Sequence, residues 1–209
     1  MAQPIWLTPA GNLGVIPEGV FFQSTLLADT APLPISITCT ATSSVTNLIT
    51  CTNTTGIYAG LNVQFSGETF GGIDSNIRYF VYAVVNSTQF SISPTESLAT
   101  QVSLTTASGT MTPVFTQHVY YFKVAGELPP GIQISDNGLI VGVPRAVASL
   151  QGVPVAVNQD ITSKFTIRAY TTTSTGTTDR IKDRTFTLTI TGNDVPEFTT
   201  PAGSLGSFY

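Results

Sequence analysis

The chain has 209 residues, only 10% of them charged, and a net charge of −4 at pH 7. Without a cluster of Lys and Arg to neutralise phosphates, this composition argues against nucleic-acid binding. No apolar run has the length of a membrane span, and the first residues lack the basic and apolar regions of a signal peptide. Polar surface comes instead from 34 threonines, which are β-branched and suit exposed strand faces. With frequent Gly and Pro and no helical periodicity, the composition predicts an all-β protein.

The chain begins with a motif that returns near its end. Residues 4–14 and 196–206 are identical at seven of 11 positions, and the third position is aromatic in both, as Trp6 and Phe198. A repeat at a fixed offset is typical of tandem modules. We therefore expect residues 196–209 to be a linker and the start of a second module, in a native protein longer than this chain. The alternative is that this tail packs alone.

Residues 20–28 predict a strand of a first domain that begins at residue 1 and is interrupted after residue 34. The region 35–112 differs in composition, with several short segments that are rich in threonine or alternate between apolar and polar residues. We predict strands at 35–42, 47–53, 61–65, 79–85, 88–92, 101–104 and 110–111. So many short strands in fewer than 80 residues favour a small barrel-like domain inserted in a loop of the first one. The continuously apolar segment 79–85 is predicted to be buried on both faces.

The two cysteines lie within this inserted region. If the chain between them turns near Ser44 and Val45, Cys39 and Cys51 lie opposite each other, and that geometry would allow a disulfide. The alternative is a pair of reduced thiols, which is usual for a protein made in a cytoplasm. His118 is the only histidine, so we expect no metal site with these thiols.

The first domain resumes at residue 113 and contains a predicted hairpin at 128–144. Two prolines and Gly131 end the preceding strand, predicted at 119–124. Residues 132–135 alternate between apolar and polar, and residues 139–143 are apolar. Between them, Asp136-Asn137-Gly138 is a strong hairpin signal, because Asn and Gly tolerate the positive φ of a primed turn.

Two further strands complete this domain. Residues 164–170 are predicted as a strand whose Phe165, Ile167 and Ala169 face inward, after an irregular stretch at 145–163 with a turn at 151–154. A threonine-rich loop is expected at 171–178. In residues 185–191 every second side chain is apolar and the others are threonine, the pattern of a sheet with one face in water.

Together these motifs resemble immunoglobulin/cadherin-like β-sandwich modules, which occur in tandem in surface and adhesion proteins. The resemblance rests on Phe122-x-Val124, Leu128-Pro-Pro-Gly-Ile, Gly138-Leu-Ile, Gly142-x-Pro144, Phe165-x-Ile167 and the strand 185–191. It implies an all-β fold class: an immunoglobulin/cadherin-like sandwich made of residues 1–34 and 113–195. The small all-β domain 35–112, inserted in one of its loops, departs from the family's usual pattern.

A second resemblance concerns phage particles. Asn47–Cys51, Gly60–Gly67 and Val85–Ser93 look like a small β module of phage virion proteins. The opening motif and the region around Arg168 and Asp179-Arg180 resemble the N-terminus of large virion structural proteins of contractile-tailed cyanobacterial phages.

This second resemblance implies a non-enzymatic virion protein, the N-terminal anchoring or assembly segment of a tail, baseplate or fibre component. Its partners would be other virion proteins and symmetry-related copies, with host-surface glycans contacted by downstream modules. Neither nucleic acid nor a membrane is an expected partner. The alternative is a cell-surface adhesin or carbohydrate-binding module. A weaker one is a glycan-degrading enzyme whose catalytic domain lies beyond residue 209.

We expect no catalytic residue, cofactor or metal ligand in the chain. The segment 193–198 resembles the calcium-binding linker of cadherins. However, calcium takes six to eight oxygen ligands, and this segment offers only Asp194, Glu197 and nearby carbonyls. A metal-free linker is therefore favoured. The loop 67–72 is glycine-rich, but no helix and no lysine follow it, so it is not a phosphate cradle.

Other polar and aromatic groups have structural explanations. The Asp136 side chain is expected to hydrogen-bond to the backbone of its own turn. His118 is expected to be solvated. Trp6 could form a sugar platform with Phe21 and Phe22, but core packing is favoured. The alternating charges of 179–184 indicate surface ion pairs, or alternatively a contact between subunits.

Overall fold

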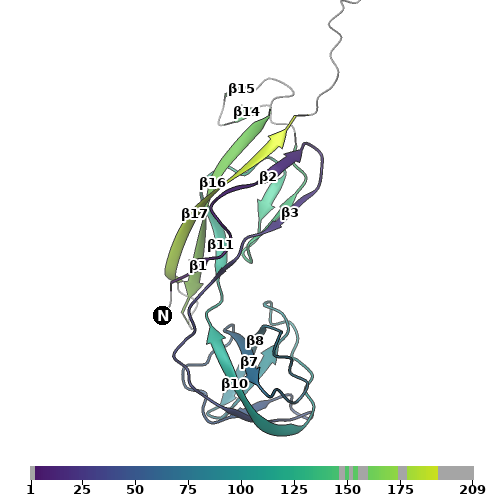
Figure 1. Ribbon diagram of the computed structural model, residues 1–209, viewed down its shortest axis with the longest axis vertical. Helices are drawn as coiled ribbons and strands as arrows, with labels where there is room; N and C mark the ends of the chain where they lie inside the picture. Colours follow the sequence, from purple (N-terminus) through teal and green to yellow (C-terminus); the bar gives the residue numbers. More distant parts are fainter. Residues whose placement is uncertain (1–2, 146–148, 151–152, 155–159, 174–177, 193–209) are drawn as a thin grey trace, which may run out of the picture.

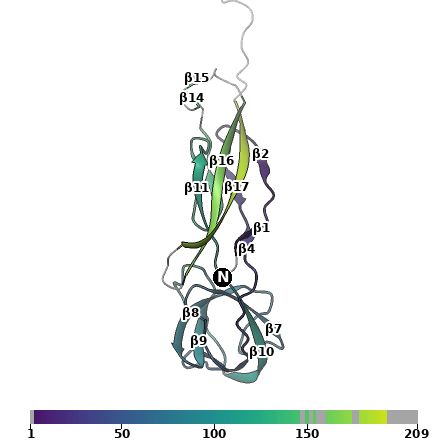
Figure 2. The same ribbon diagram turned by 90° about the vertical axis from the view of Figure 1, so that its left-hand side faces the viewer.

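The computed structural model describes residues 3–145, 149–150, 153–154, 160–173 and 178–192. Throughout these ranges the protein is all-β, without a helix, as the composition predicted. The strands form a closed barrel and a separate unit of two facing sheets, and the barrel occupies one end of an elongated molecule (Figure 1). Turning the molecule by 90° shows the same elongated outline (Figure 2).

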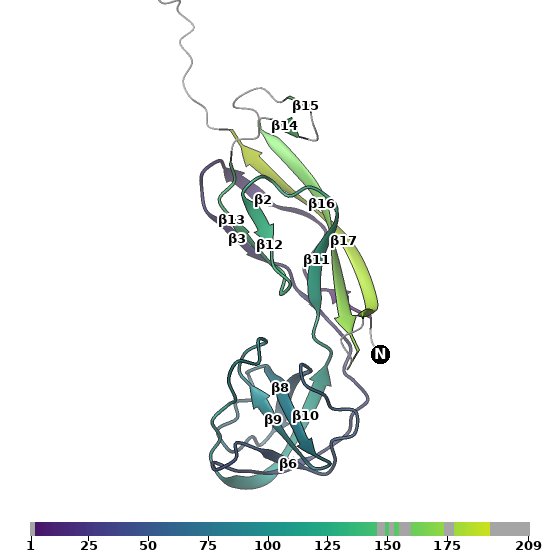
Figure 3. The same ribbon diagram turned by 180° about the vertical axis from the view of Figure 1, so that it is seen from behind.

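The larger unit, here called the two-sheet unit, contains a four-stranded and a three-stranded sheet, which are seen one in front of the other in Figure 3. The four-stranded sheet has the order β11 (Tyr120–Gly126), β16 (Ile161–Thr172), β17 (Thr178–Thr191) and β2 (Gly11–Pro17). Its strands are antiparallel except that β2 runs parallel to β17. The other sheet has the order β12 (Ile132–Ile134), β13 (Leu139–Gly142) and β3 (Phe22–Thr25). Two short pairs accompany them, β1 (Ile5–Trp6) with β4 (Ala28–Asp29) and β14 (Ser149–Leu150) with β15 (Val153–Pro154).

Side chains from both sheets fill one hydrophobic core. The alternation predicted for β16 is confirmed, because Phe165, Ile167 and Ala169 are buried in this core. The opposite face of the same sheet carries threonines whose hydroxyls pair across strands, Thr162 with Thr189 at 2.8 Å and Thr166 with Thr185 at 3.0 Å. The core also includes Trp6, Leu26, Val119, Tyr121, Ile132, Ile140, Phe186, Leu188 and Ile190.

The predicted hairpin is present as β12 and β13, but its turn is of a different kind. Within the turn between the two strands, Gly138 has a positive φ, of 84°, and Asn137 does not. The Gly138 N–H donates to the Ser135 carbonyl at 3.0 Å, and the Ser135 N–H donates to the Leu139 carbonyl at 2.9 Å. A turn with a single left-handed glycine after ordinary residues is the common alternative to a primed turn.

Two glycines of this hairpin are in close contact. A Cβ on Gly142 would lie 2.0 Å from the Gly131 carbonyl oxygen, and one on Gly131 would lie 2.1 Å from the Val143 carbonyl oxygen. Both have positive φ. The hairpin therefore needs glycine at both positions so that its two chains can approach.

The smaller unit is a closed barrel of strands in the order β10-β5-β6-β9-β8-β7. The strands are β5 (Cys39–Thr42), β6 (Ile49–Cys51), β7 (Asn62–Gly67), β8 (Tyr79–Asn86), β9 (Gln89–Ser93) and β10 (Ala107–Thr116). Its interior is a second hydrophobic core, with Phe65, Phe90 and Phe115 at most 1% exposed. Closure leaves no unpaired strand edge, which removes the usual route to edge-to-edge association.

The two cysteines occupy the predicted positions. Cys39 lies opposite Cys51 in the register of β5 and β6. Both are buried and free. Burial, reinforced by the neighbouring Cys51, raises the pKa of the Cys39 thiol to about 12, so it stays protonated.

Three predictions for the inserted region were wrong in detail. β8 is not buried on both faces, because its barrel has only one interior face; Val85 is 56% exposed. Residues 101–104 form no strand, although Leu104 is buried and its N–H donates to the Asn47 side chain at 3.0 Å. Finally, β10 continues past residue 112, the expected end of the inserted domain, because Pro113 lies within the strand opposite Phe65.

The region 145–163 contains more strand than expected. β14 pairs with β15, and β16 already begins at Ile161. β16 also extends through Thr172, and β17 begins at Thr178, so both ends of the predicted loop belong to strands. The expected turn residues Gln151 and Gly152 lie outside the described residues.

Candidate functional site

The barrel is attached to the two-sheet unit by two connecting segments, residues 30–38 and 117–119, which are bonded to each other. The Gln117 N–H donates to the Thr30 hydroxyl at 3.0 Å, and Leu33 donates to the Phe115 carbonyl at 2.8 Å. The Gln117 side chain donates to the Thr172 carbonyl at 3.3 Å. The junction is therefore held by backbone and side-chain bonds rather than by a free linker.

His118 lies at the centre of this junction, and the expectation that it is solvated was wrong. Its side chain is 13% exposed. Nδ1 is 3.4 Å from the Asn62 amide oxygen, and Nε2 is 3.1 Å from Glu96 Oε1. The second contact is close enough for an ion pair but lacks the alignment of a hydrogen bond. The ring also packs edge-on against Phe80 and Tyr120.

The charge state of His118 depends on several neighbours. Burial lowers the pKa of its imidazole below the ordinary 6.5, and the positive charge of Arg78 acts in the same direction. The carboxylates of Glu96 and Asp136 oppose this effect. Since desolvation is the largest influence, the ring is held in its neutral form at neutral pH.

An ion pair crosses the junction, and a buried hydrogen bond lies on its two-sheet side. Arg78, immediately before β8, is 2.7 Å from Asp29 in β4. The Tyr121 hydroxyl accepts a hydrogen bond from the Ala28 N–H at 2.6 Å, and burial raises the pKa of this phenol to about 12. The exposed Arg78–Asp29 pair contributes at most about 1 kcal/mol, so its main effect is on the relative position of the two units.

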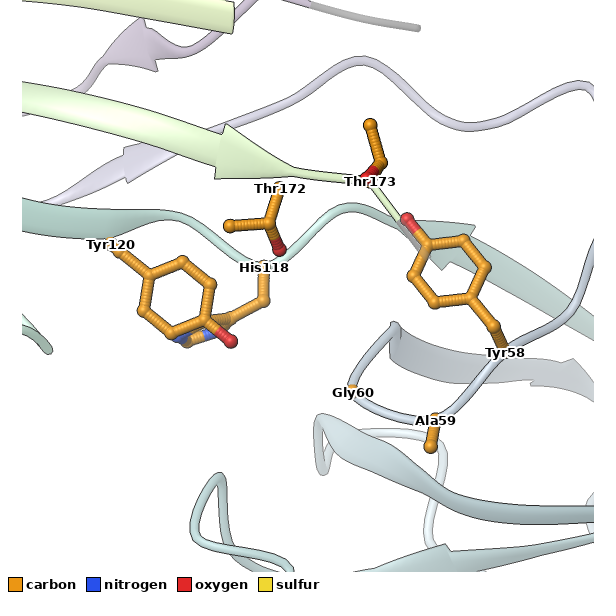
Figure 4. A pocket seen from close by; sticks show the side chains of 7 residues that line it. All are labelled: Tyr58, Ala59, Gly60, His118, Tyr120, Thr172 and Thr173. Carbon is orange, nitrogen blue, oxygen red and sulfur yellow. The ribbon is translucent and has the colours of Figure 1, made fainter. Parts of the chain in front are cut away.

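His118 is one of the residues that line a pocket of about 200 Å³ at the junction. The barrel contributes Tyr58, Ala59 and Gly60, and the two-sheet unit contributes Tyr120, Thr172 and Thr173. Figure 4 shows the Tyr120 and Tyr58 rings on its two sides, both with a broad face toward the viewer. The sequence did not predict this pocket, because nothing in it indicates that residues of the inserted barrel meet residues of the two-sheet unit.

The aromatic and charged residues considered from the sequence have structural roles. Trp6 is 7% exposed and packs in the core, as favoured, while Phe21 is 61% exposed and apart from it. Of the charged residues at 179–184, Asp183 forms an ion pair with Arg168, at 2.7 Å. Arg184 instead packs over the Trp6 ring at 5.7 Å.

No metal centre emerges from the described part of the chain, where no three His, Cys, Asp or Glu side chains gather in a way that could hold an ion. The segment 193–198, considered as a calcium linker, lies outside the described residues. In the described ranges, no helix is long and apolar enough to span a membrane.

No family model, curated protein or solved structure matches this chain. The family resemblances based on its motifs therefore remain predictions.

Proposed function

We propose that this chain is a non-enzymatic structural module of a phage virion, an anchoring segment of a tail, baseplate or fibre component. The proposal starts from the fold that the motifs predict, an immunoglobulin/cadherin-like sandwich. The strands of such a sandwich are lettered A to G in chain order. Strands B, E and D share one sheet, and strands C, F and G form the other.

The observation that carries the proposal is the strand order of the two-sheet unit. In chain order β3, β11, β12, β13, β16 and β17 correspond to strands B to G. The order β12-β13-β3 is then D-E-B, and β11-β16-β17 is C-F-G. The barrel lies between B and C, within one loop. This agreement supports the sandwich, and with it the assignment to tandem modules.

The chemistry of the molecule supports a structural role over catalysis. The cysteine thiols are buried, and the histidine is enclosed between Asn62, Glu96 and aromatic rings. The exposed sheet face carries two threonine pairs and the Arg168–Asp183 ion pair. Such a surface stays hydrated with few charges and leaves the chain free to act through its interfaces with neighbouring proteins.

The proposal is tested on particles. Antibodies raised against residues 1–209 should label one substructure of purified virions of the source phage, and mass spectrometry should find the chain there in a fixed ratio to other particle proteins. Absence of the protein from purified virions would contradict the proposal. Turnover of a glycan by the purified chain would instead support the enzyme alternative.

A further inference from the structure

A larger cleft, here called the hairpin cleft, lies where the barrel meets the turn of the hairpin β12–β13. In Figure 3 this turn lies at the end of its sheet nearest the barrel. The cleft has a volume of about 710 Å³, within the range of about 300–1,000 Å³ typical of ligand sites, which often lie between domains. The barrel contributes Phe80 and residues 94–97, and the two-sheet unit contributes Tyr120, Asp136 and Asn137.

Two carboxylates of this lining, those of Asp136 and Glu96, have no hydrogen-bond partner among the described residues. The sequence predicted that Asp136 bonds to the backbone of its turn, but Asn137 does so instead, because its side-chain oxygen accepts from the Leu139 N–H at 3.2 Å. Glu96 lies 3.1 Å from His118 without the alignment of a hydrogen bond. Since this histidine is neutral at neutral pH, neither carboxylate has a cationic partner there.

The charges around the hairpin cleft do not balance. Arg78 lines a smaller pocket that shares Glu96 with the cleft, but its guanidinium is already paired with Asp29, at 2.7 Å. With Asp136, three carboxylates thus lie near one guanidinium, and negative charge is in excess. The excess also acts on Tyr120, because burial raises the pKa of its phenol and the carboxylates of Glu96 and Asp136 raise it further. A cation is attracted to such a cleft.

We propose that the hairpin cleft binds a guanidinium group, the side chain of an arginine on a partner protein. A guanidinium carries five N–H donors in a flat fork, so that one group can bond to more than one acceptor oxygen. Its flat faces also pack on aromatic side chains, which Phe80 and Tyr120 provide. A lysine ammonium is a compact point charge without this flat surface. The inference applies to any protein partner, so it does not rest on the assignment to a virion.

Other classes of ligand fit this lining less well. No Lys, Arg or His lines the hairpin cleft, so a phosphate or a carboxylate would meet side chains of its own charge. In the part of the chain that the structure describes, no three His, Cys, Asp or Glu side chains are placed to hold a metal ion. A neutral ligand would remove water from Glu96 and Asp136 without compensating their charges. An organic cation avoids all three difficulties.

Both rims of the hairpin cleft are held in place by hydrogen bonds of the protein itself. On the hairpin side, the Tyr121 N–H donates to the Asp136 carbonyl at 2.8 Å. On the barrel side, the Thr95 N–H donates to the Ser93 hydroxyl at 3.2 Å, and the hydroxyls of Thr95 and Ser97 lie 3.2 Å apart. Groups that are already ordered lose less conformational entropy when a ligand binds.

The test uses the intact 209-residue chain, labelled with nitrogen-15, and two-dimensional NMR titrations. The main probe is N-acetyl-arginine N-methylamide, a capped arginine that resembles a side chain within a protein. It should shift the amide signals of the hairpin turn and of residues 94–97. The citrulline analogue has nearly the same shape without the charge and should bind about tenfold more weakly. The lysine analogue should also bind more weakly than the arginine probe.

Two variants locate the binding site. Asp136→Asn and Glu96→Gln each remove one carboxylate at almost constant size, and each should weaken binding of the capped arginine by about tenfold. The matched control is Glu127→Gln, because Glu127 is an exposed carboxylate outside the lining of the hairpin cleft. It should leave the affinity unchanged. The amide spectrum of each variant shows whether it is folded, and the citrulline comparison needs no variant at all.

The proposal is overturned if the capped arginine shifts no signal at the hairpin cleft, or if the citrulline analogue binds equally well. Undiminished binding in both Asp136→Asn and Glu96→Gln would place the arginine elsewhere. A lysine analogue that binds as tightly would contradict the choice of a guanidinium. Free arginine that binds more tightly than the capped form would contradict the choice of a protein side chain. Detection of the chain in virions is a separate measurement, so either proposal can fail alone.

Discussion

At the residue scale, Trp6 is the side chain that connects the beginning of the chain to the core. Its ring packs against Tyr121 and Phe186, both at 5.5 Å, and its indole N–H donates to the Lys182 carbonyl at 3.0 Å. Truncation leaves a cavity and an unpaired carbonyl. We expect Trp6→Ala to lower the free energy of unfolding by about 3–5 kcal/mol, measured by urea denaturation.

The matched control is Phe21→Ala, since Phe21 is aromatic but 61% exposed. It should change the free energy of unfolding by about 0.5 kcal/mol or less. Equal losses in the two variants would show that Trp6 is not a core residue.

His118 gives a pH dependence whose sign follows from its burial. The folded protein holds the pKa of His118 below the ordinary 6.5 that the unfolded chain regains. Between the two values the unfolded state binds more protons, so stability is complete above about pH 6.5 and declines as the pH falls through this window. We expect His118→Gln to flatten this decline, measured as urea midpoints between about pH 7.5 and pH 5.

A second variant tests the cause. Glu96→Gln removes a carboxylate that raises the pKa of His118, so the decline on acidification should become larger. Asp183 does not interfere, because Arg168 lowers the pKa of that carboxyl from 3.8 and its loss of stability therefore lies at lower pH. A His118→Gln variant with an unchanged pH profile would assign the decline to other groups.

At the element scale, the hairpin β12–β13 depends on the contact between Gly131 and Gly142. A Cβ at Gly142 would meet the Gly131 carbonyl at 2.0 Å, and that backbone atom cannot move without separating the strands. We expect Gly142→Ala to destabilise the protein by about 2–4 kcal/mol, combining strain and lost packing. Thermal or urea unfolding measures the loss.

Gly19 provides the control for backbone conformation alone. It also has a positive φ, 76°, but no atom lies within 4 Å of the position of its Cβ. Gly19→Ala should therefore cost only about 1 kcal/mol. If both variants lost the same amount, the steric explanation of the glycine pair would be wrong.

Strands were predicted correctly from the sequence where their local pattern of apolar and polar residues was strong. β16 and β17 were predicted because their period of two is a direct consequence of one buried face. The apolar run of β8 was misjudged because a strand in a barrel and a strand between two layers have the same composition. The turn at Asn137 differed because both turn types accept an Asn-Gly pair, and the choice depends on strand twist.

At the scale of the whole molecule, the junction sets how the barrel lies against the two-sheet unit. The Arg78–Asp29 ion pair crosses it, and Glu96 of the barrel lies 3.1 Å from His118 in the connecting segment. A variant with Arg78→Ala and Glu96→Ala should keep its secondary structure but show a broader pair-distance distribution in small-angle X-ray scattering. Arg168→Ala is the control, because its partner Asp183 belongs to the same sheet. An unchanged profile in the double variant would mean that the connecting segments alone hold the junction.

The junction is also where prediction from the sequence ended. The insertion could be recognised from the change in composition after residue 34. Contacts between residues as distant in sequence as Tyr58 and Thr172, however, depend on how the barrel packs against the two-sheet unit. His118 was misplaced for the same reason: an isolated histidine next to a strand has no local pattern that reveals burial. None of the pocket residues has a sequence pattern of its own that predicts a pocket. The pocket arises only because the tertiary structure brings these residues together.

Both ends of the barrel connect to the two-sheet unit, and this connection has a mechanical consequence. Tension applied between β2 and the end of β17 would be carried by the hydrogen bonds of their parallel pairing. The barrel is connected through two neighbouring segments that lie outside this load path. Stretching the chain would thus strain the two-sheet unit and leave the barrel folded. Whatever the barrel presents to its surroundings would keep its shape while the remainder of the molecule bears the pull.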